Sequence, residues 1–211
     1  MKRELLFPTP IWKFEKCGVD VNKLHDFIKL VREEDPAGRV ASNDGGWQSH
    51  DFTDAVMQTN PLIDIRNSII ERAYVAADDF GFRSYSLHIT NLWININGKG
   101  HYNHLHAHPG SILSGVYYVK LPPCCHGALS FIRRYEEQMM KESWGNAHNF
   151  DPWEDHNLLD YDVYPEEDLM VLFPSWLQHT VAKNTGDGER ISLSFNLVAH
   201  SDFYHEIYPS R

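Results

Sequence analysis

Hydrophobic residues follow one spacing in the first part of the 211-residue chain and a different spacing from about residue 84 onward. In the first part they recur every three or four positions, which is typical of amphipathic helices. One stripe runs from Val21 to Val31, with Asp20 as its expected N-cap and Pro36 just beyond its end. The spacing therefore predicts a first amphipathic helix.

A second helical stripe occupies about residues 61–80. We expect Asn60 to cap this helix, Pro61 to lie in its first turn and Gly81 to end it. The segment 42–52, between the two helices, contains too many Gly and Asn residues for a regular element. It is expected to form an ordered loop.

From about residue 84 onward, hydrophobic and polar residues alternate, as they do in a half-buried β-strand. The first such strand carries aliphatic side chains on one face and polar or aromatic ones on the other: Leu92, Ile94 and Ile96 against Trp93, Asn95 and Asn97. Further strands, separated by Gly, Pro, Asn and Asp turns, are expected at 111–122, 127–134, 168–174, 179–184 and 190–200.

Helices followed by strands predict a mainly β protein with flanking α-helices, in which the strands form a barrel or jelly roll. We expect one domain over residues 1–211, because a chain of this length is common as a single β domain. The helical flank covers about 1–82 and the barrel about 83–200. Residues 135–167 are rich in acidic and aromatic residues without steady periodicity, which predicts an insert that is either a lid or a surface excursion.

The composition narrows the classes of partner and location. A net charge of −10 argues against general nucleic-acid binding, which requires a basic surface. The three cysteines, Cys17, Cys124 and Cys125, form no CxxC pair, so we expect neither a disulfide framework nor a thiolate zinc site. No uncharged apolar run approaches the roughly 18 residues of a membrane helix. The expectation is a cytoplasmic protein without membrane contact.

Three alternating histidines in the segment HLHAH, together with the distant His179, are the main chemical signal. Alternate residues of a strand point the same way, so an HxH pair and a third histidine can bind one face of a metal ion. Two registers are open. We favour His106 with His108, because the turn HPGS places both at a strand end and leaves His104 one step away on the same face. The other register pairs His104 with His106.

A row of polar residues on the last strand supplies a second signal: Arg190, Ser192, Ser194 and Asn196 alternate with apolar residues. Such a row in a barrel interior is expected to hold a polar ligand, and an arginine fork suits a carboxylate. The alternative for Arg190 is a surface pair with Glu189 or Asp187. With a metal nearby, the pattern predicts a metal-dependent oxygenase that binds a dicarboxylate.

Other side chains are expected to contribute to the same ligand pocket. Asn95 and Asn97 line up on the polar face of their strand, and buried amides need hydrogen-bond partners. Capping of the strand end is the alternative for these two. Tyr118 is the aromatic residue of its strand whose hydroxyl we expect to reach the pocket.

These residues lie in blocks that resemble the 2-oxoglutarate and iron(II)-dependent oxygenases. The blocks are LFPTPIW near the start, SNDGGWQS, HAHPGSILSGVYYV, and FPSWLQHTV followed by ERISLSFNL. The resemblance extends over nearly the whole chain, from about Leu6 to Val198, apart from the insert. More distantly, the chain is similar to the prolyl hydroxylases and the AlkB-like dealkylases, which share the fold.

The resemblance implies a double-stranded β-helix with iron(II) bound by His106, His108 and His179. It implies that 2-oxoglutarate chelates the iron, that Arg190 pairs with its distal carboxylate and that Ser192 lies alongside. Asn95 and Asn97 fall on a strand that contacts the co-substrate in relatives. The implied reaction consumes O2 and couples decarboxylation of 2-oxoglutarate to hydroxylation of another molecule.

One departure from the wider superfamily concerns the metal ligands. The usual set is two histidines and one carboxylate, whereas His108 occupies the carboxylate position here. A neutral ligand in place of an anion leaves the metal complex one unit more positive. One of two carboxylates in the insert, that of Asp160 or that of Asp162, is expected to be able to approach the metal site.

Two other functions remain open at the level of sequence. One is a cupin-like metalloenzyme that uses three histidines without a keto acid, and the other is a metal-binding module without activity. Arg190 favours the oxygenase, because a cupin has no need of a carboxylate clamp on that strand. The expected prime substrate is a protein or peptide side chain or a small metabolite, and a homodimer is one alternative for the oligomeric state.

Overall fold

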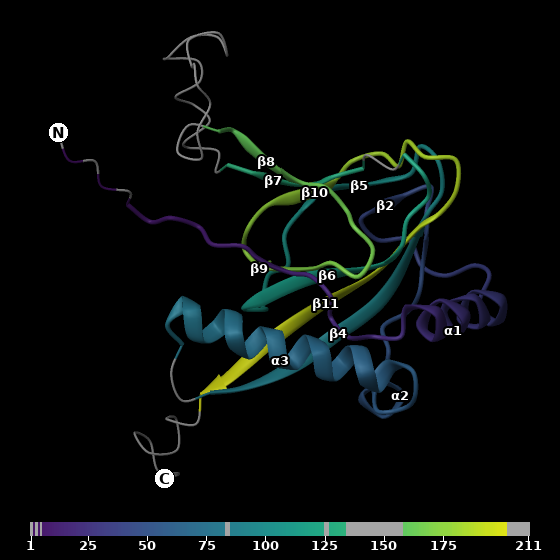
Figure 1. The fold of residues 1–211 in the computed structure, drawn as a ribbon, viewed down its shortest axis with the longest axis horizontal. Coiled ribbons are helices and arrows are strands. Elements are labelled where there is room, and N and C mark those ends of the chain that lie inside the picture. The colour runs from purple at the N-terminus through teal and green to yellow at the C-terminus, as the bar shows by residue number, and fades with distance from the viewer. Residues whose placement is uncertain are drawn as a thin grey trace, which may run out of the picture.

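The computed structural model describes residues 6–82, 85–124, 127–133 and 158–201, together with Lys2 and Glu4. Two antiparallel sheets lie one above the other, and the helices lie on the outer side of the larger sheet (Figure 1). The six-stranded sheet has the order β1-β9-β6-β11-β4-β3, and the five-stranded sheet has the order β2-β5-β10-β7-β8. The fold is a double-stranded β-helix, mainly β with flanking helices, as the sequence predicted.

The strands of the larger sheet are β1 (Trp12–Phe14), β3 (Trp47–Gln48), β4 (Tyr85–Asn97), β6 (Leu113–Lys120), β9 (Met170–Pro174) and β11 (Arg190–Ser201). Those of the smaller sheet are β2 (Asn43–Asp44), β5 (Tyr102–His106), β7 (Leu129–Ile132), β8 (Asp160–Val163) and β10 (His179–Val181). Each strand expected from the alternating pattern is present, in most cases a few residues shorter than expected.

The two expected helices are α1 (Val21–Glu34) and α3 (Leu62–Phe80), and a short α2 (Asp54–Met57) precedes α3. The Asp20 side chain accepts a hydrogen bond from the Lys23 backbone N–H, as an N-cap does. Gly81 ends α3 in the left-handed conformation that glycine adopts without steric cost. The predicted cap at Asn60 is wrong: Pro61 occupies the N-cap position, and no side chain caps this helix.

The six-stranded sheet has one apolar face and one polar face. The apolar face packs against α1 and α3 in one core, which contains Leu92, Ile94 and Ile96 from β4 and fully buried helix residues such as Ile28 and Ile65. Burying an aliphatic side chain of this size contributes about 1.5–3 kcal/mol. The polar face of the same strands is thereby turned toward the five-stranded sheet.

Short strands outside the predicted ones complete both sheets. β1, β2 and β3 lie within the flank 1–82 that was expected to be helical, and β2 and β3 lie in the expected loop 42–52. β8 lies inside the expected insert, where it pairs with β7. Each of these strands has two to four residues, too few to show a period in the sequence, and forms because a partner strand offers an edge. Of the insert, residues 135–157 fall outside the described residues.

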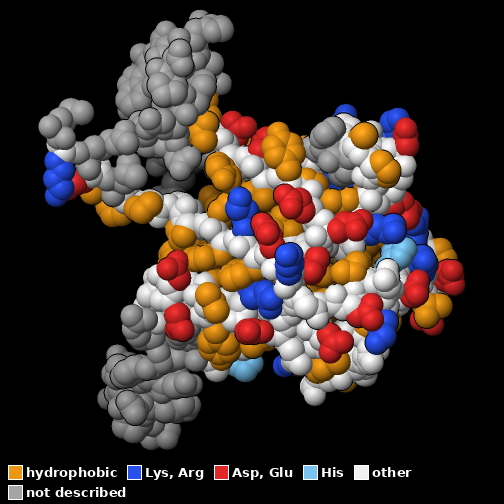
Figure 2. Space-filling view, viewed as in Figure 1, with side chains coloured by type: hydrophobic (Ala, Val, Ile, Leu, Met, Phe, Trp, Pro, Cys, Tyr) orange, Lys and Arg blue, Asp and Glu red, His pale blue; other side chains and the backbone are white. Residues whose placement is uncertain are grey.

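The surface seen in Figure 2 mixes acidic and basic side chains, with hydrophobic side chains between them. Within the described residues, none of the helices has both the length and the apolar character of a membrane span.

Candidate metal centre and its pocket

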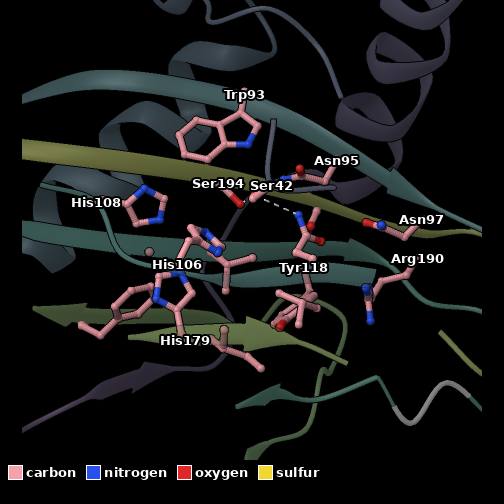
Figure 3. A pocket seen from close by; sticks show the side chains of 17 residues that line it. Ser42, Trp93, Asn95, Asn97, His106, His108, Tyr118, His179, Arg190 and Ser194 are labelled. Atoms are coloured by element: carbon pink, nitrogen blue, oxygen red, sulfur yellow. Dashed lines mark hydrogen bonds between the residues drawn. The ribbon is translucent and has the colours of Figure 1, made fainter. Parts of the chain in front are cut away.

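Three histidines meet in one pocket between the two sheets. His106 ends β5, His108 follows in the adjoining turn, and His179 begins β10. Their candidate ligand atoms all lie within 4.8 Å of one another. Figure 3 shows the three rings gathered toward one end of the pocket. The geometry therefore unites His106, His108 and His179 and leaves His104 outside the group.

Two backbone carbonyls fix which ring nitrogen can bind a metal. His106 Nδ1 lies 2.6 Å from the His104 carbonyl oxygen, and His179 Nδ1 lies 2.8 Å from the Leu177 carbonyl oxygen. A carbonyl oxygen only accepts, so both Nδ1 atoms must carry the proton and donate it. The lone pair of each neutral ring is then on Nε2, which is the usual arrangement for a histidine that binds a metal.

A β-bulge explains why His104 is excluded. His179 pairs with His106, but Val181 pairs with Asn103, so two steps on β10 match three on β5. The extra residue reverses the alternation of side chains between Asn103 and His106, both of which line the pocket. His104 is exposed, and its Nε2 lies 3.6 Å from a carboxylate oxygen of Asp44. The expectation that His104 shares a face with His106 is therefore wrong.

Burial keeps the three imidazoles neutral. It lowers the pKa of His179 to about 3 and that of His108 to about 4, and neighbouring imidazoles add to both shifts. Burial also lowers the pKa of His106, against the opposing effect of the hydrogen bond to His104. At neutral pH all three rings are unprotonated on one nitrogen, so the cluster is ready to accept a cation.

Arg190 lies at the other end of the pocket from the histidines (Figure 3). Its side chain is almost fully buried, with 1% of the residue exposed. Nη1 donates to the carbonyl oxygens of Gly127 at 2.9 Å and Ala182 at 3.2 Å. Nη2 is buried and has no hydrogen-bond partner among the described residues. A buried guanidinium in this state calls for an anionic ligand, because an unpaired charge is costly to bury.

Glycine at position 127 makes this placement of Arg190 achievable. A Cβ atom added to Gly127 would lie 2.1 Å from Arg190 Nη1, far inside van der Waals contact. Arg190 is not in the surface pair with Glu189 that the sequence left open; Glu189 instead pairs with Arg32 of α1.

The remaining expected pocket residues lie on the polar face of the larger sheet. Asn95, Asn97, Tyr118 and Ser192 all line the pocket. Asn95 Nδ2 donates to Ser194 Oγ at 3.0 Å, while its Oδ1 has no partner in the described structure, and the same is true of Asn97 Nδ2. Strand pairing aligns Asn97 with Arg190 and Asn95 with Ser192. The pocket floor is therefore a polar row with unmet hydrogen-bonding capacity.

No carboxylate joins the three histidines within the described part of the chain. Asp160 and Asp162 lie on β8, the edge strand, with exposed side chains, and Asp162 accepts a hydrogen bond from Ser130. Neither belongs to the histidine group, so the expectation that one of them approaches the site is not met. A set of three neutral imidazole donors suits iron, zinc, copper or nickel in the divalent state.

Several residues that line the pocket were not predicted from the sequence to contact a ligand. Trp93 lines the pocket with its ring centroid 6.0 Å from that of His108, and Phe173 lies 4.7 Å from His179 by the same measure. Ser42 and Asn103 also line it. The sequence puts Trp93 on the polar face of its strand, and this position could have identified it as a pocket residue. No sequence pattern could have identified Ser42, because its position depends on how a loop packs on β5.

A family model described as "Putative 2OG-Fe(II) oxygenase" matches residues 91–196. This is half of the chain, from β4 to β11, and it contains each candidate residue from Asn95 to Ser192. Among curated proteins, no sequence matches this chain.

Solved structures with the same fold include two prolyl hydroxylases and the protein HygX, all of low sequence identity. The viral collagen prolyl hydroxylase of Paramecium Bursaria Chlorella virus-1, solved as its 2OG complex, has 11% identity and a TM-score of 0.55, over 89% of this chain and 94% of that one. A Pseudomonas putida prolyl-4-hydroxylase has 13% identity and a TM-score of 0.55, over 90% and 92%. HygX from Streptomyces hygroscopicus, solved with nickel, 2-oxoglutarate and hygromycin B, has 10% identity and a TM-score of 0.60, over 92% and 84%.

Proposed function

The chain belongs to the 2OG-Fe(II) oxygenase family, and from that premise we propose that three of its histidines hold the iron and that Arg190 holds the co-substrate. It is an enzyme that depends on iron(II) and 2-oxoglutarate and uses O2. His106, His108 and His179 are the proposed metal ligands. Arg190, Ser192, Asn95, Asn97 and Tyr118 are the proposed co-substrate contacts. The family match favours 2-oxoglutarate use over a cupin-like enzyme without a keto acid.

The single observation that carries this assignment is the buried, half-paired guanidinium of Arg190 in the same pocket as the three histidines. One end of the pocket offers neutral nitrogen donors to a cation, and the other offers a cation to an anion. A dicarboxylate chelated to a metal satisfies both ends at once. An Nη2 without a partner fits a carboxylate oxygen, since Arg forms its strongest hydrogen bonds with carboxylates.

The protein contributes positioning and exclusion of water. When bound, iron(II) and 2-oxoglutarate supply the oxidising chemistry, which consumes O2 and yields succinate and carbon dioxide. The carbonyls of His104 and Leu177 orient two imidazoles and hold their protons on Nδ1. The carbonyls of Gly127 and Ala182 hold the guanidinium of Arg190 in place before any ligand arrives. Phe131 and Phe173 pack around His179 and keep water from it.

The prime substrate is proposed to be hydroxylated, and to be a protein or peptide side chain or a small metabolite. Neighbours of this fold are named as prolyl hydroxylases and as a protein with bound hygromycin B, so the fold accommodates both kinds of molecule. A cytoplasmic location and a homodimer stay predictions; the first rests on the cysteine pattern and the second on the symmetry common in soluble proteins.

Succinate formation from 2-oxoglutarate tests the proposal without a known prime substrate. Protein purified without oxygen is loaded with iron(II) and 2-oxoglutarate and then exposed to O2. We expect slow succinate formation by the unaltered protein and its loss in His179→Ala and Arg190→Met. Binding is followed separately through the visible charge-transfer band of the iron and 2-oxoglutarate complex under anaerobic conditions.

Arg66→Met is the matched control for Arg190→Met. Arg66 lies on α3, outside the pocket, where its guanidinium contacts the neighbouring Asn67. This variant should retain both the band and succinate formation. If Arg190→Met keeps the affinity of the unaltered protein for 2-oxoglutarate, the assignment of Arg190 is wrong.

A further inference from the structure

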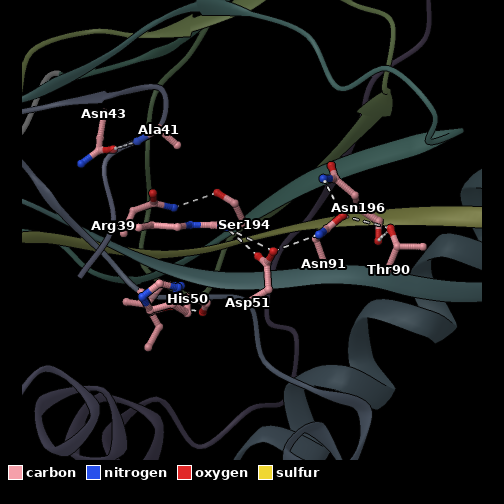
Figure 4. Close-up of polar contacts among 12 residues, drawn as sticks. Arg39, Ala41, Asn43, His50, Asp51, Thr90, Asn91, Ser194 and Asn196 are labelled. Atoms are coloured by element: carbon pink, nitrogen blue, oxygen red, sulfur yellow. Dashed lines mark hydrogen bonds and ion pairs between the residues drawn. The ribbon is translucent and has the colours of Figure 1, made fainter. Parts of the chain in front are cut away.

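A chain of hydrogen bonds outside the proposed iron and co-substrate contacts fixes the side chain of Arg39 (Figure 4). Arg39 forms a two-point ion pair with Asp51, with Nη1 to Oδ2 at 3.2 Å and Nη2 to Oδ1 at 2.9 Å. Asp51 Oδ2 also accepts from Asn91 Nδ2 at 3.0 Å, and Asn91 Oδ1 in turn accepts from Asn196 Nδ2 at 3.4 Å. Side chains from one loop and two strands therefore preorganise one guanidinium.

Arg39 acts on the pocket through Trp93. The guanidinium carbon of Arg39 lies 5.6 Å from the Trp93 ring centroid, within the range of a cation–π contact. Trp93 is 8% exposed, lines the pocket and lies beside His108. The ion pair, the indole and a proposed iron ligand thus form one continuous set of contacts.

Trp93 and Arg39 lie toward the end of the pocket that 2-oxoglutarate does not occupy in the proposed binding mode. Pairing of β4 with β11 aligns Asn97 with Arg190 and Trp93 with Ser194, four residues apart along the strand. A ligand that joins the histidines to Arg190 extends along the Asn97 end. The Trp93 end stays available to a second ligand that approaches the same metal.

Some N–H groups of Arg39 remain available for further hydrogen bonds. A guanidinium has five N–H donors, and the ion pair with Asp51 uses two of them. Among the described residues no further side-chain hydrogen bond of Arg39 is found, and its buried Nε has no partner. The side chains of Arg39 and Asp51 are 29% and 32% exposed, so a ligand can reach the pair, and Arg39 lies against Trp93, which lines the pocket.

We propose that Trp93 and Arg39 form the subsite for the prime substrate and that they recognise an amino-acid unit. The indole packs against the apolar part of that unit, and the free N–H groups of Arg39 donate to its carbonyl or carboxylate oxygen. An amino-acid unit carries an apolar part and a carbonyl or carboxylate oxygen within one residue. These are the two groups that the neighbouring Trp93 and Arg39 can bind together. Asp51 is a positioning residue, which holds the fork of Arg39 over the indole. The inference rests on the proposed function.

The test follows the Trp93 indole N–H signal by nuclear magnetic resonance in protein saturated with zinc(II), a redox-inert stand-in for iron, and with 2-oxoglutarate. Trp93→Phe assigns the signal. The probes are two matched sets, the free amino acids and their N-acetyl, N-methylamide derivatives. We expect at least one probe to shift the signal in a saturable way. Binding of a free amino acid alone indicates a metabolite substrate, and binding of a blocked derivative indicates a peptide residue.

Variants separate recognition from loss of structure. Arg39→Met should lower the affinity for the bound probe by about tenfold or more relative to any change in affinity for 2-oxoglutarate, and Arg39→Lys should restore part of the loss. Arg66→Met should change neither affinity. If no probe from either set moves the signal while 2-oxoglutarate still binds, the subsite is wrong and the proposed function stands. If 2-oxoglutarate itself does not bind the zinc-loaded protein, it is the proposed function that fails.

Discussion

The two ends of the pocket handle charge in opposite ways. At the histidine end, burial removes charge: the pKa of His179 falls to about 3 and that of His108 to about 4. At the other end, Arg190 keeps its charge although it is almost fully buried, because a guanidinium does not lose its proton in proteins. One end is complete when a cation binds and the other when an anion binds. The pocket is therefore built for a ligand pair rather than for a single ligand.

Removing a histidine ligand should have the largest effect. In His179→Ala only two imidazoles remain, so we expect iron(II) or nickel(II) binding and succinate formation to be lost. Equilibrium dialysis with nickel(II) measures the first without turnover. His104→Ala is the matched control, because His104 belongs to the same HLHAH segment but points to Asp44. A similar loss of metal in His104→Ala would show that the bulge does not exclude that residue.

Removing the charge of Arg190 should lower the affinity for the dicarboxylate and leave the affinity for the metal ion nearly unchanged. In Arg190→Met the dicarboxylate loses a charge-assisted hydrogen bond worth about 2–3 kcal/mol, so its affinity should fall roughly 30- to 150-fold. Nickel(II) affinity should change little, since Arg190 does not belong to the histidine group. Calorimetric titration of each ligand measures the two effects. An equal loss of both would mean that the two ends are not independent.

Acid should destabilise the metal-free protein through the histidine end. The pKa of His179 in the folded protein lies below its ordinary value of 6.5. Above pH 6.5 the His179 imidazole is therefore neutral in both the folded and the unfolded chain. Just below pH 6.5 it gains a proton only in the unfolded chain. The free energy of unfolding should therefore fall by about 2 kcal/mol per such histidine between pH 6.5 and pH 5. Urea denaturation at the two pH values measures the loss. His179→Gln should reduce this loss.

A single methyl group at the arginine end should produce the smallest effect. Gly127→Ala places a Cβ where Arg190 Nη1 now lies, and relief of the overlap should cost about 1–2 kcal/mol of co-substrate affinity. The KM for 2-oxoglutarate in succinate formation should rise by roughly tenfold. Gly98→Ala is the control, because its Cβ would make only ordinary contacts with His101. No change in KM for Gly127→Ala would show that Arg190 adjusts freely.

The parts of the fold that repeat a local pattern could be predicted from sequence. The alternation around Asn95 and that around Ser192 extend over enough residues to identify β4, β11 and the face of each that meets the pocket. The caps of α1 at Asp20 and of α3 at Gly81 act within one turn of the helix, so local chemistry was again sufficient.

The parts that depend on a partner strand could not be predicted. The bulge that separates His104 from His106 exists only relative to β10, more than seventy residues away, and the sequence of β5 alone contains no trace of it. Strands of two or three residues, such as β2 and β1, are also too short to be recognised from an alternating pattern in the sequence. Arg39 was missed for the same reason: it lies in a loop, and its importance comes from Asp51 and Trp93, which only the folded chain brings to it.

The buried guanidinium of Arg190 also bears on how long the protein survives in a cell. A ligand that binds only the folded state stabilises it by mass action, by about 2.7 kcal/mol at a concentration one hundred times its Kd. A dicarboxylate that neutralises Arg190 has this property, because the unfolded chain contains no such site. The fraction of chains open to proteases should then fall as the dicarboxylate becomes plentiful. Supply of the co-substrate would thereby set the abundance of the enzyme as well as its rate.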